Sequence, residues 1–151
     1  MKDIPLSEIT LRKYEKPANL EKRELFRKIC LSLGLLQLAD SRDIIVDILM
    51  ILSEANKTKE NLTSDEINKR VGELRKKYSL PDKGLAESNI RRQLKRLRDK
   101  MIVEKTENKY YLIEHSSLKD IFEKNIEKFV IPPIIERIKE YLDEIEKTPT
   151  G

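Results

Sequence analysis

One stretch of the sequence concentrates side chains that bind anions. Residues 87–100, ESNIRRQLKRLRDK, carry six cationic side chains, with apolar residues at Ile90, Leu94 and Leu97. The apolar residues recur every three or four positions, which predicts a helix with one buried edge and one cationic edge. Because a guanidinium donates two parallel hydrogen bonds, such an edge can bind phosphate oxygens or the N7 and O6 acceptors of guanine.

Positive charge is concentrated in this part of the chain. The 151 residues carry a net charge of +4, whereas residues 83–105 have eight cations and three anions and residues 114–147 have six cations and nine anions. Abundant Lys, Glu and Ile is typical of thermophile proteins, in which a solvated charged helix is common. A solvent-exposed helix is therefore one interpretation of residues 87–100, but their almost purely cationic character favours contact with nucleic acid.

Several classes of protein lack support in the sequence. With one cysteine, Cys30, and one histidine, His115, and without a glycine-rich phosphate loop, we expect no metal, no cofactor and no enzymatic activity. The apolar run 44–52 is shorter than the roughly 20 residues that cross a bilayer, so we expect a cytoplasmic protein with no membrane partner. Asp43 and Asp47, one helical turn apart, are expected to form a surface salt-bridge pattern around Arg42.

The apolar spacing predicts the elements that position the basic helix. We expect helices over residues 19–33, capped by Asn19, and over residues 42–56, which would be central and buried. Thr63 and Glu66 form a capping-box pattern that starts a third helix. Pro81 and Gly84 then predict a turn into the basic helix. The segment MIVEKTENKYYLI, residues 101–113, predicts two short strands around the polar sequence EKTENK.

The C-terminal third predicts two further helices. Residues 118–129 carry one apolar stripe, and Pro132 and Pro133 are expected to end that helix and start another. The second helix has a continuous apolar face, which could pack on the N-terminal helix of the same chain or on a second subunit. We favour a homodimer through the C-terminal helices, with recognition helices meeting major grooves about 34 Å apart.

This order of elements predicts a mainly α protein with a small β-hairpin, a winged helix-turn-helix core with flanking N- and C-terminal helices. The expected divisions are 1–40 for an irregular arm and helix, 41–113 for the core and 114–151 for the C-terminal helices. The segment GLAESNIRRQLKRLRDKMIVEKTENKYYLI resembles the recognition helix and wing of winged helix-turn-helix DNA-binding proteins, the MarR-like and ArsR-like transcription regulators, with an archaeal-type composition. It departs from their pattern at Ala86, where a Ser or Thr cap is usual, and at Met101, where Gly commonly closes the helix.

The resemblance implies double-stranded DNA as the partner, with the basic helix in the major groove and the wing, residues 102–113, on the adjacent backbone. We expect base contacts from Ser88, Asn89, Arg91 and Arg92, phosphate contacts from Lys95 and Arg96, and wing contacts from Lys105 and Lys109. Arg75, Lys76 and Lys77 are expected to add phosphate contacts.

Two functions fit these residues. The first is a DNA-binding transcription regulator, which the polar Ser88 and Asn89 ahead of the arginines favour. The second is a winged-helix module that binds a protein, or binds nucleic acid without sequence preference, within a larger transcription or replication assembly.

Overall fold

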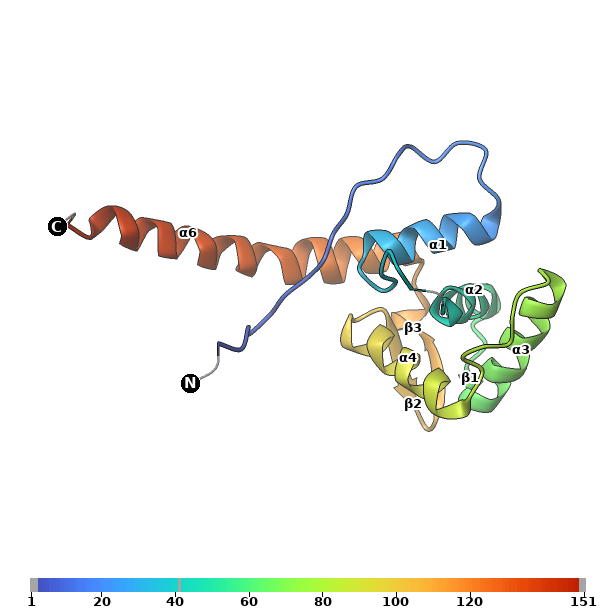
Figure 1. The fold of residues 1–151 in the computed structure, drawn as a ribbon. Coiled ribbons are helices and arrows are strands. Elements are labelled where there is room, and N and C mark those ends of the chain that lie inside the picture. The colour runs from blue at the N-terminus through green and yellow to red at the C-terminus, as the bar shows by residue number, and fades with distance from the viewer. Residues whose placement is uncertain (1–2, 41, 150–151) are drawn as a thin grey trace.

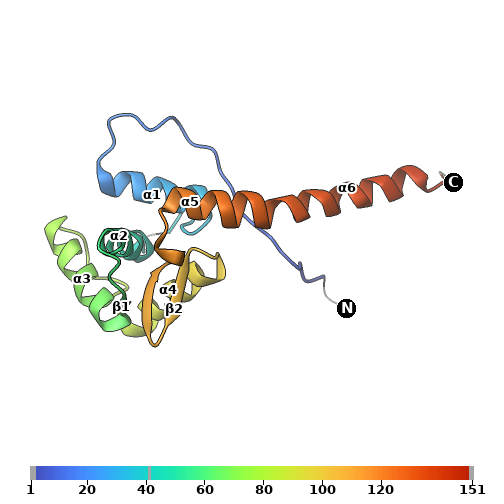
Figure 2. The same cartoon turned by 180° about the vertical axis from the view of Figure 1, so that it is seen from behind.

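A computed structural model describes residues 3–40 and 42–149, which form a body of packed helices with a small sheet at one side and one long helix projecting from it (Figures 1 and 2). The elements are α1 (Lys22–Ser32), α2 (Ile44–Asn56), β1 (Leu62–Thr63), α3 (Ser64–Lys77), α4 (Glu87–Asp99), β2 (Val103–Thr106), β3 (Lys109–Leu112), the 3-10 turn η1 (Ile113–His115), α5 (Leu118–Ile121), the π-helical segment η2 (Phe122–Val130) and α6 (Ile131–Lys147). The predicted fold class, mainly α with a small hairpin, is confirmed.

Helix α2 is the centre of the core, as the sequence predicts. It contacts α1, α3, α4 and β3. Its apolar residues are buried almost all the way round, among them Ile44, Ile48, Leu49 and Leu52. Burial on every side explains why the apolar residues of α2 form a near-continuous run rather than a single stripe.

Helices α3 and α4 form the helix-turn-helix. The predicted capping box is present, because the Thr63 hydroxyl accepts from the Glu66 amide at 3.2 Å and the Glu66 carboxylate accepts from the Thr63 amide at 3.0 Å. The turn before α4 requires a glycine, since Gly84 has a φ of +91° and a Cβ there would lie 2.8 Å from Ile44 Cγ1. The Asn68 amide of α3 donates to the Leu85 carbonyl at 2.6 Å and fixes the entry to α4.

The sheet has three antiparallel strands in the order β1–β3–β2. The predicted hairpin is present, but its turn consists only of Glu107 and Asn108, both with positive φ, so the strands extend into the polar EKTENK sequence. Strand β1 was not predicted, because two residues carry no detectable alternation. It pairs Leu62 with Tyr110 and ties the start of α3 to the wing.

Met101 adopts the helix exit that a glycine usually makes. Its φ is +62°, its amide donates to the Arg98 carbonyl at 2.9 Å, and the Ile102 amide donates to the Leu97 carbonyl at 3.0 Å. This is the hydrogen-bond pattern of a Schellman motif. The departure from glycine at Met101 therefore leaves the helix exit unchanged, and the chain leaves α4 directly into β2.

The C-terminal helices run on without the expected break. Val130 and Ile131 both have helical backbone angles, so η2 passes straight into α6, and Pro132 and Pro133 lie in the first turn of α6. The change from π to α hydrogen bonding falls where Pro132 and Pro133 cannot donate a backbone hydrogen bond to the preceding turn. Figures 1 and 2 show α6 leaving the body as a single straight rod.

The N-terminal arm is extended and irregular, as predicted, but it is fastened to the body. Arg12 donates from its backbone to the Ser32 carbonyl at 2.9 Å and from its guanidinium to the Leu31 carbonyl at 2.8 Å. Helix α1 begins three residues later than expected, after Glu21, because Asn19 has a φ of +56° and does not cap it.

Candidate nucleic-acid interface

Helix α4 separates its apolar and cationic side chains as the sequence predicts. Ile90, Leu94 and Leu97 are 0% exposed and face the core. Side chains exposed on the opposite edge are Ser88, Arg91, Arg92, Lys95 and Arg98. The cationic edge defined by these five residues is thus a surface feature of the protein.

The ion pairs on this edge are local. Arg91 Nη1 lies 3.4 Å from Glu87 Oε1, and Lys95 Nζ lies 3.1 Å from Asp99 Oδ2, both one helical turn apart and exposed. Such surface pairs contribute only about 0–1 kcal/mol, so a phosphate can replace the carboxylate at little cost. The acidic α6 projects away from α4 (Figure 1), and the five side chains of the cationic edge are exposed.

Asn89 does not lie on the exposed edge, contrary to the prediction that it approaches the bases. Its side chain is 6% exposed, and its amide donates to the Gly84 carbonyl at 2.8 Å. Its oxygen accepts from Arg92 Nη2 at 2.7 Å and from Gln93 Nε2 at 3.2 Å. Asn89 therefore holds the turn before α4 and orients Arg92.

Arg96 faces the body rather than standing free on the edge. It is half-buried, with Nη1 donating to Gln93 Oε1 at 2.9 Å and Nη2 lying 3.5 Å from the Gly34 carbonyl. The guanidinium thus reaches the turn between α1 and α2. Arg96 could make its predicted phosphate contact only from beside the exposed cationic edge.

The wing adds two exposed cations beside α4. Lys105 and Lys109 are exposed on β2 and β3, and Lys105 Nζ lies 5.5 Å from the centre of the Tyr110 ring. A shallow groove between α4 and β2 is lined by Lys95, Arg98 and Lys105 among others. Arg98 was not among the predicted contact residues, although its spacing, one turn after Lys95 and two turns after Arg91, places it on the same side of the helix.

Arg75 is part of a buried ion network and cannot contact phosphate. It is 2% exposed, and its Nη1 lies 2.6 Å from Asp47 and 3.0 Å from Asp43. Arg23 of α1 completes the network, at 3.0 Å from Asp43 and 3.1 Å from Asp47. The expected surface pattern around Arg42 is wrong, since the two carboxylates join α1, α2 and α3 from inside. Lys76 and Lys77 are exposed, as that prediction requires.

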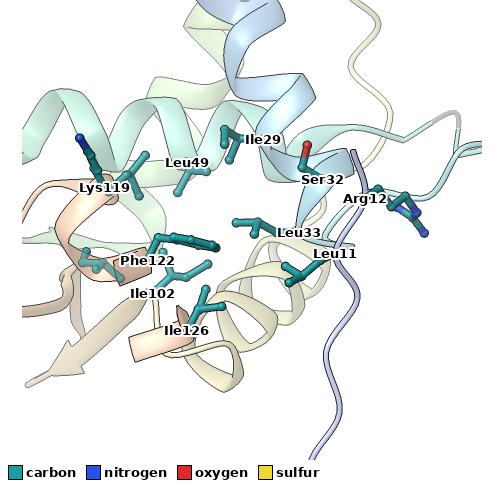
Figure 3. Close-up of a pocket in the computed structure, with 12 residues that line it drawn as sticks. Leu11, Arg12, Ile29, Ser32, Leu33, Leu49, Ile102, Lys119, Phe122 and Ile126 are labelled. Carbon is teal, nitrogen blue, oxygen red and sulfur yellow. The ribbon is translucent and has the colours of Figure 1, made fainter. Parts of the chain in front are cut away.

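A second concave feature lies on the other side of the body. It is an apolar cavity of about 480 Å³ between the arm, α1, α2 and η2. Figure 3 shows Phe122 and Ile126 from η2 facing Leu33, just past α1, with Lys119 at one edge. Apart from Ile102, which follows α4, its lining comes from outside the helix-turn-helix and wing.

Comparison with known families agrees with the geometry of the core. Residues 40–112 match the family model of the Dam-replacing HTH domain. The match runs from just before α2 to the end of β3, and it supports a winged helix-turn-helix of DNA-binding type. It does not extend to the finer resemblance to MarR-like and ArsR-like regulators. Neither the curated proteins nor the solved structures gave a match. Over residues 3–40 and 42–149, the protein has no helix that is both long and apolar enough to span a bilayer.

Proposed function

We propose that the protein is a transcription regulator of the winged helix-turn-helix class, resembling MarR-like and ArsR-like regulators in its use of the wing. Helix α4 would enter the major groove of double-stranded DNA, and the β2–β3 hairpin would contact the adjacent backbone. A helix with side chains is about 10–12 Å across, which fits a major groove about 12 Å wide.

The observation that carries this proposal is the exposure of the cationic edge next to the wing. Ser88, Arg91 and Arg92 lie near the N-terminal end of α4, the end that usually reads base edges. Lys95 and Arg98 lie further along, beside Lys105 of the wing. The first group would read sequence and the second would bind phosphates.

Duplex binding over a range of salt concentrations tests the proposal. Affinity for a random duplex should fall with salt, with a slope of about −0.9 per neutralised phosphate. Selection from a random pool should then enrich a defined site. Arg92→Ala should relax base preference at particular positions of that site, whereas Lys95→Ala should reduce the salt slope by about one.

The same experiment distinguishes the proposed regulator from the alternative function, a winged-helix module without sequence preference. A salt-dependent affinity with no enriched sequence would favour a non-specific nucleic-acid module, and no duplex binding at low salt would favour a protein-interaction module. Lys128→Ala, an exposed cation on η2 far along the chain from α4, is the matched control and should change neither affinity nor slope.

We also infer that the regulator acts as a homodimer through its C-terminal helices. Over its described length, α6 has no buried residue, and its exposed side chains include Ile135, Ile138 and Leu142. An apolar face of this size on a projecting helix is expected to be covered in solution. A two-fold dimer would present two recognition helices to a two-fold symmetric site.

A further inference from the structure

The apolar side chains of α6 follow a heptad pattern. Alternating steps of three and four residues connect Ile131, Ile134, Ile138, Tyr141 and Ile145. Ile135 and Leu142 each stand next to this series and widen the stripe on one side. Two helices with this spacing can pack side by side with their apolar residues interlocked.

The stripe has almost no partner within its own chain. Ile138 is 55%, Tyr141 67% and Ile145 66% exposed. Both views show α6 extending away from the body toward its C-terminal end (Figures 1 and 2), while Ile131 and Ile134 near its base are half-buried. Other helical elements expose fewer large apolar side chains, namely Leu25 and Ile29 of α1 and Phe129 of η2, so among the described residues α6 has the most.

We propose that α6 pairs antiparallel with α6 of a second copy of this chain, Ile138 packing opposite Tyr141 and Ile134 opposite Ile145. This inference rests on the proposed function, in which the protein is a homodimer, and it adds the partner, the direction and the register of the pairing.

The charges beside the stripe determine the direction. Arg137 and Glu144 lie seven residues apart on the same flank of the stripe, opposite the flank that carries Ile135 and Leu142. A two-fold axis perpendicular to an antiparallel pair brings each flank against the same flank of the partner. Arg137 then meets Glu144 of the other copy, and this ion pair forms twice in the dimer.

The other flank agrees with the same direction. In the antiparallel register Ile135 lies near Leu142 of the other copy, so the apolar contact is extended on that flank. A parallel pair would instead bring each flank against the opposite flank of the partner. Arg137 would then lie beside Leu142, without a carboxylate, and Glu144 would have no cation of the same series opposite it.

The size of the stripe predicts a reversible dimer. The exposed apolar side chains of two α6 helices would bury on the order of 1,000 Å², near the lower limit of about 1,200 Å² for stable complexes. The internal pairs of α6 offer little competition, because Arg137–Glu140 at 3.5 Å and Lys147–Glu144 at 3.8 Å are long and exposed.

Sedimentation of the full chain without DNA tests the pairing. The wild-type chain should change from monomer to dimer with rising concentration. Arg137→Glu and Glu144→Arg should each weaken the dimer roughly tenfold, because each variant has two like-charged pairs. The double variant R137E/E144R should return the dissociation constant to within about threefold of wild type, since the ion pairs re-form with reversed sign.

Matched controls lie on α6 itself. Lys139→Glu and Glu136→Arg make the same charge changes at positions outside the stripe that form no described ion pair with Arg137 or Glu144, and they should leave the dissociation constant unchanged. Ile138→Glu should abolish the dimer, while an unchanged thermal unfolding of the winged body shows that the variant is folded.

Three results would overturn the pairing: a monomer at every concentration, a dimer indifferent to Arg137→Glu and Glu144→Arg, or a double variant as weak as the single ones. A monomer that still selects a duplex would remove the pairing and the inferred homodimer, and it would leave DNA recognition by α4 standing. A dimer that is sensitive to the charge changes but has no affinity for duplex would support the pairing of α6 and contradict DNA binding.

Discussion

Arg75 Nη1 lies 2.6 Å from Asp47 Oδ2, and both side chains are almost completely buried, at 2% and 0% exposed. The Arg75 Nε also donates to the Pro81 carbonyl at 2.6 Å, in the turn that leads to α4. One guanidinium therefore joins the central helix α2 to the turn that positions the recognition helix. The network with Arg23 and Asp43 gives each buried charge an opposite charge, as burial requires.

Removing Arg75 should destabilise the protein severely. Arg75→Met keeps an apolar stem of similar length but leaves Asp47 with only Arg23 as a partner, which should cost about 3–5 kcal/mol of unfolding free energy. Urea denaturation measures the loss. Lys76→Met, at an exposed neighbouring position, should change the unfolding free energy by no more than about 0.5 kcal/mol. Equal effects of the two substitutions would show that the network contributes nothing.

The same network should make stability depend on acid pH. Burial opposes ionisation of Asp43, but hydrogen bonds and charges from Arg23 and Arg75 outweigh it, so the pKa of Asp43 lies below its usual value of 3.8. Since the folded pKa is below the unfolded one, the stabilisation is present above about pH 4 and is lost as the pH falls through the folded pKa.

Urea denaturation from pH 6 to about pH 2.5 checks this dependence. Wild type should lose unfolding free energy below about pH 4, and Asp43→Asn should show a shallower loss from a lower starting stability. Glu54→Gln is the control, because the partners of Glu54 in the described part of the chain are the exposed Lys22 and Lys57, and such surface pairs contribute little to stability. An Asp43→Asn profile parallel to that of wild type would contradict the assignment.

The sequence predicted the elements that depend on local residues. The capping box of Thr63 and Glu66, the stripe of Ile90, Leu94 and Leu97, and the turn at Gly84 each follow from neighbours along the chain. For the same reason the cationic edge of α4 could be predicted, because the apolar stripe fixes which side of the helix faces out. The separation of apolar and cationic side chains on α4 is thus determined by the sequence of the helix itself.

The predictions that were wrong concern residues whose surroundings depend on the tertiary structure or on an unusual helix geometry. Arg75 and Asn89 are of residue types that are usually exposed. Their burial is explained by hydrogen-bond partners such as Asp47, 28 positions from Arg75, and the Gly84 carbonyl, which accepts from Asn89. Pro132 was expected to break a helix, because the π-helical turn before it leaves no clear mark in the sequence. Tertiary partners of this kind cannot be deduced from periodicity.

Asn89 should affect stability more than it affects recognition. Asn89→Ala leaves the Gly84 carbonyl without its buried donor, so unfolding free energy should fall by about 1–3 kcal/mol. Ser88→Ala, at the exposed neighbouring position, should stay within about 0.5 kcal/mol of wild type. In duplex binding, Asn89→Ala should lose less affinity than Arg92→Ala. A stable Asn89→Ala variant with altered base preference would instead place Asn89 against the DNA.

Ser79 offers a stabilising substitution. Helix α3 ends as α4 does, with the Ser79 amide donating to the Lys76 carbonyl at 3.1 Å and the Leu80 amide donating to the Arg75 carbonyl at 2.8 Å. This places Ser79 at a φ of +54°, where a Cβ costs energy that glycine avoids. Gly34 occupies the equivalent position after α1, with a φ of +71°.

Ser79→Gly should raise the unfolding free energy by about 0.5–1 kcal/mol, since relief of the left-handed conformation exceeds the extra entropy of glycine in the unfolded chain. Thermal and urea denaturation measure the gain. Ser79→Ala retains the Cβ and should give no gain, which makes it the matched control for loss of the hydroxyl. Because Ser79 is exposed, neither substitution removes core packing. If Ser79→Gly and Ser79→Ala had equal stability, the Cβ would not be the source of strain at this helix end.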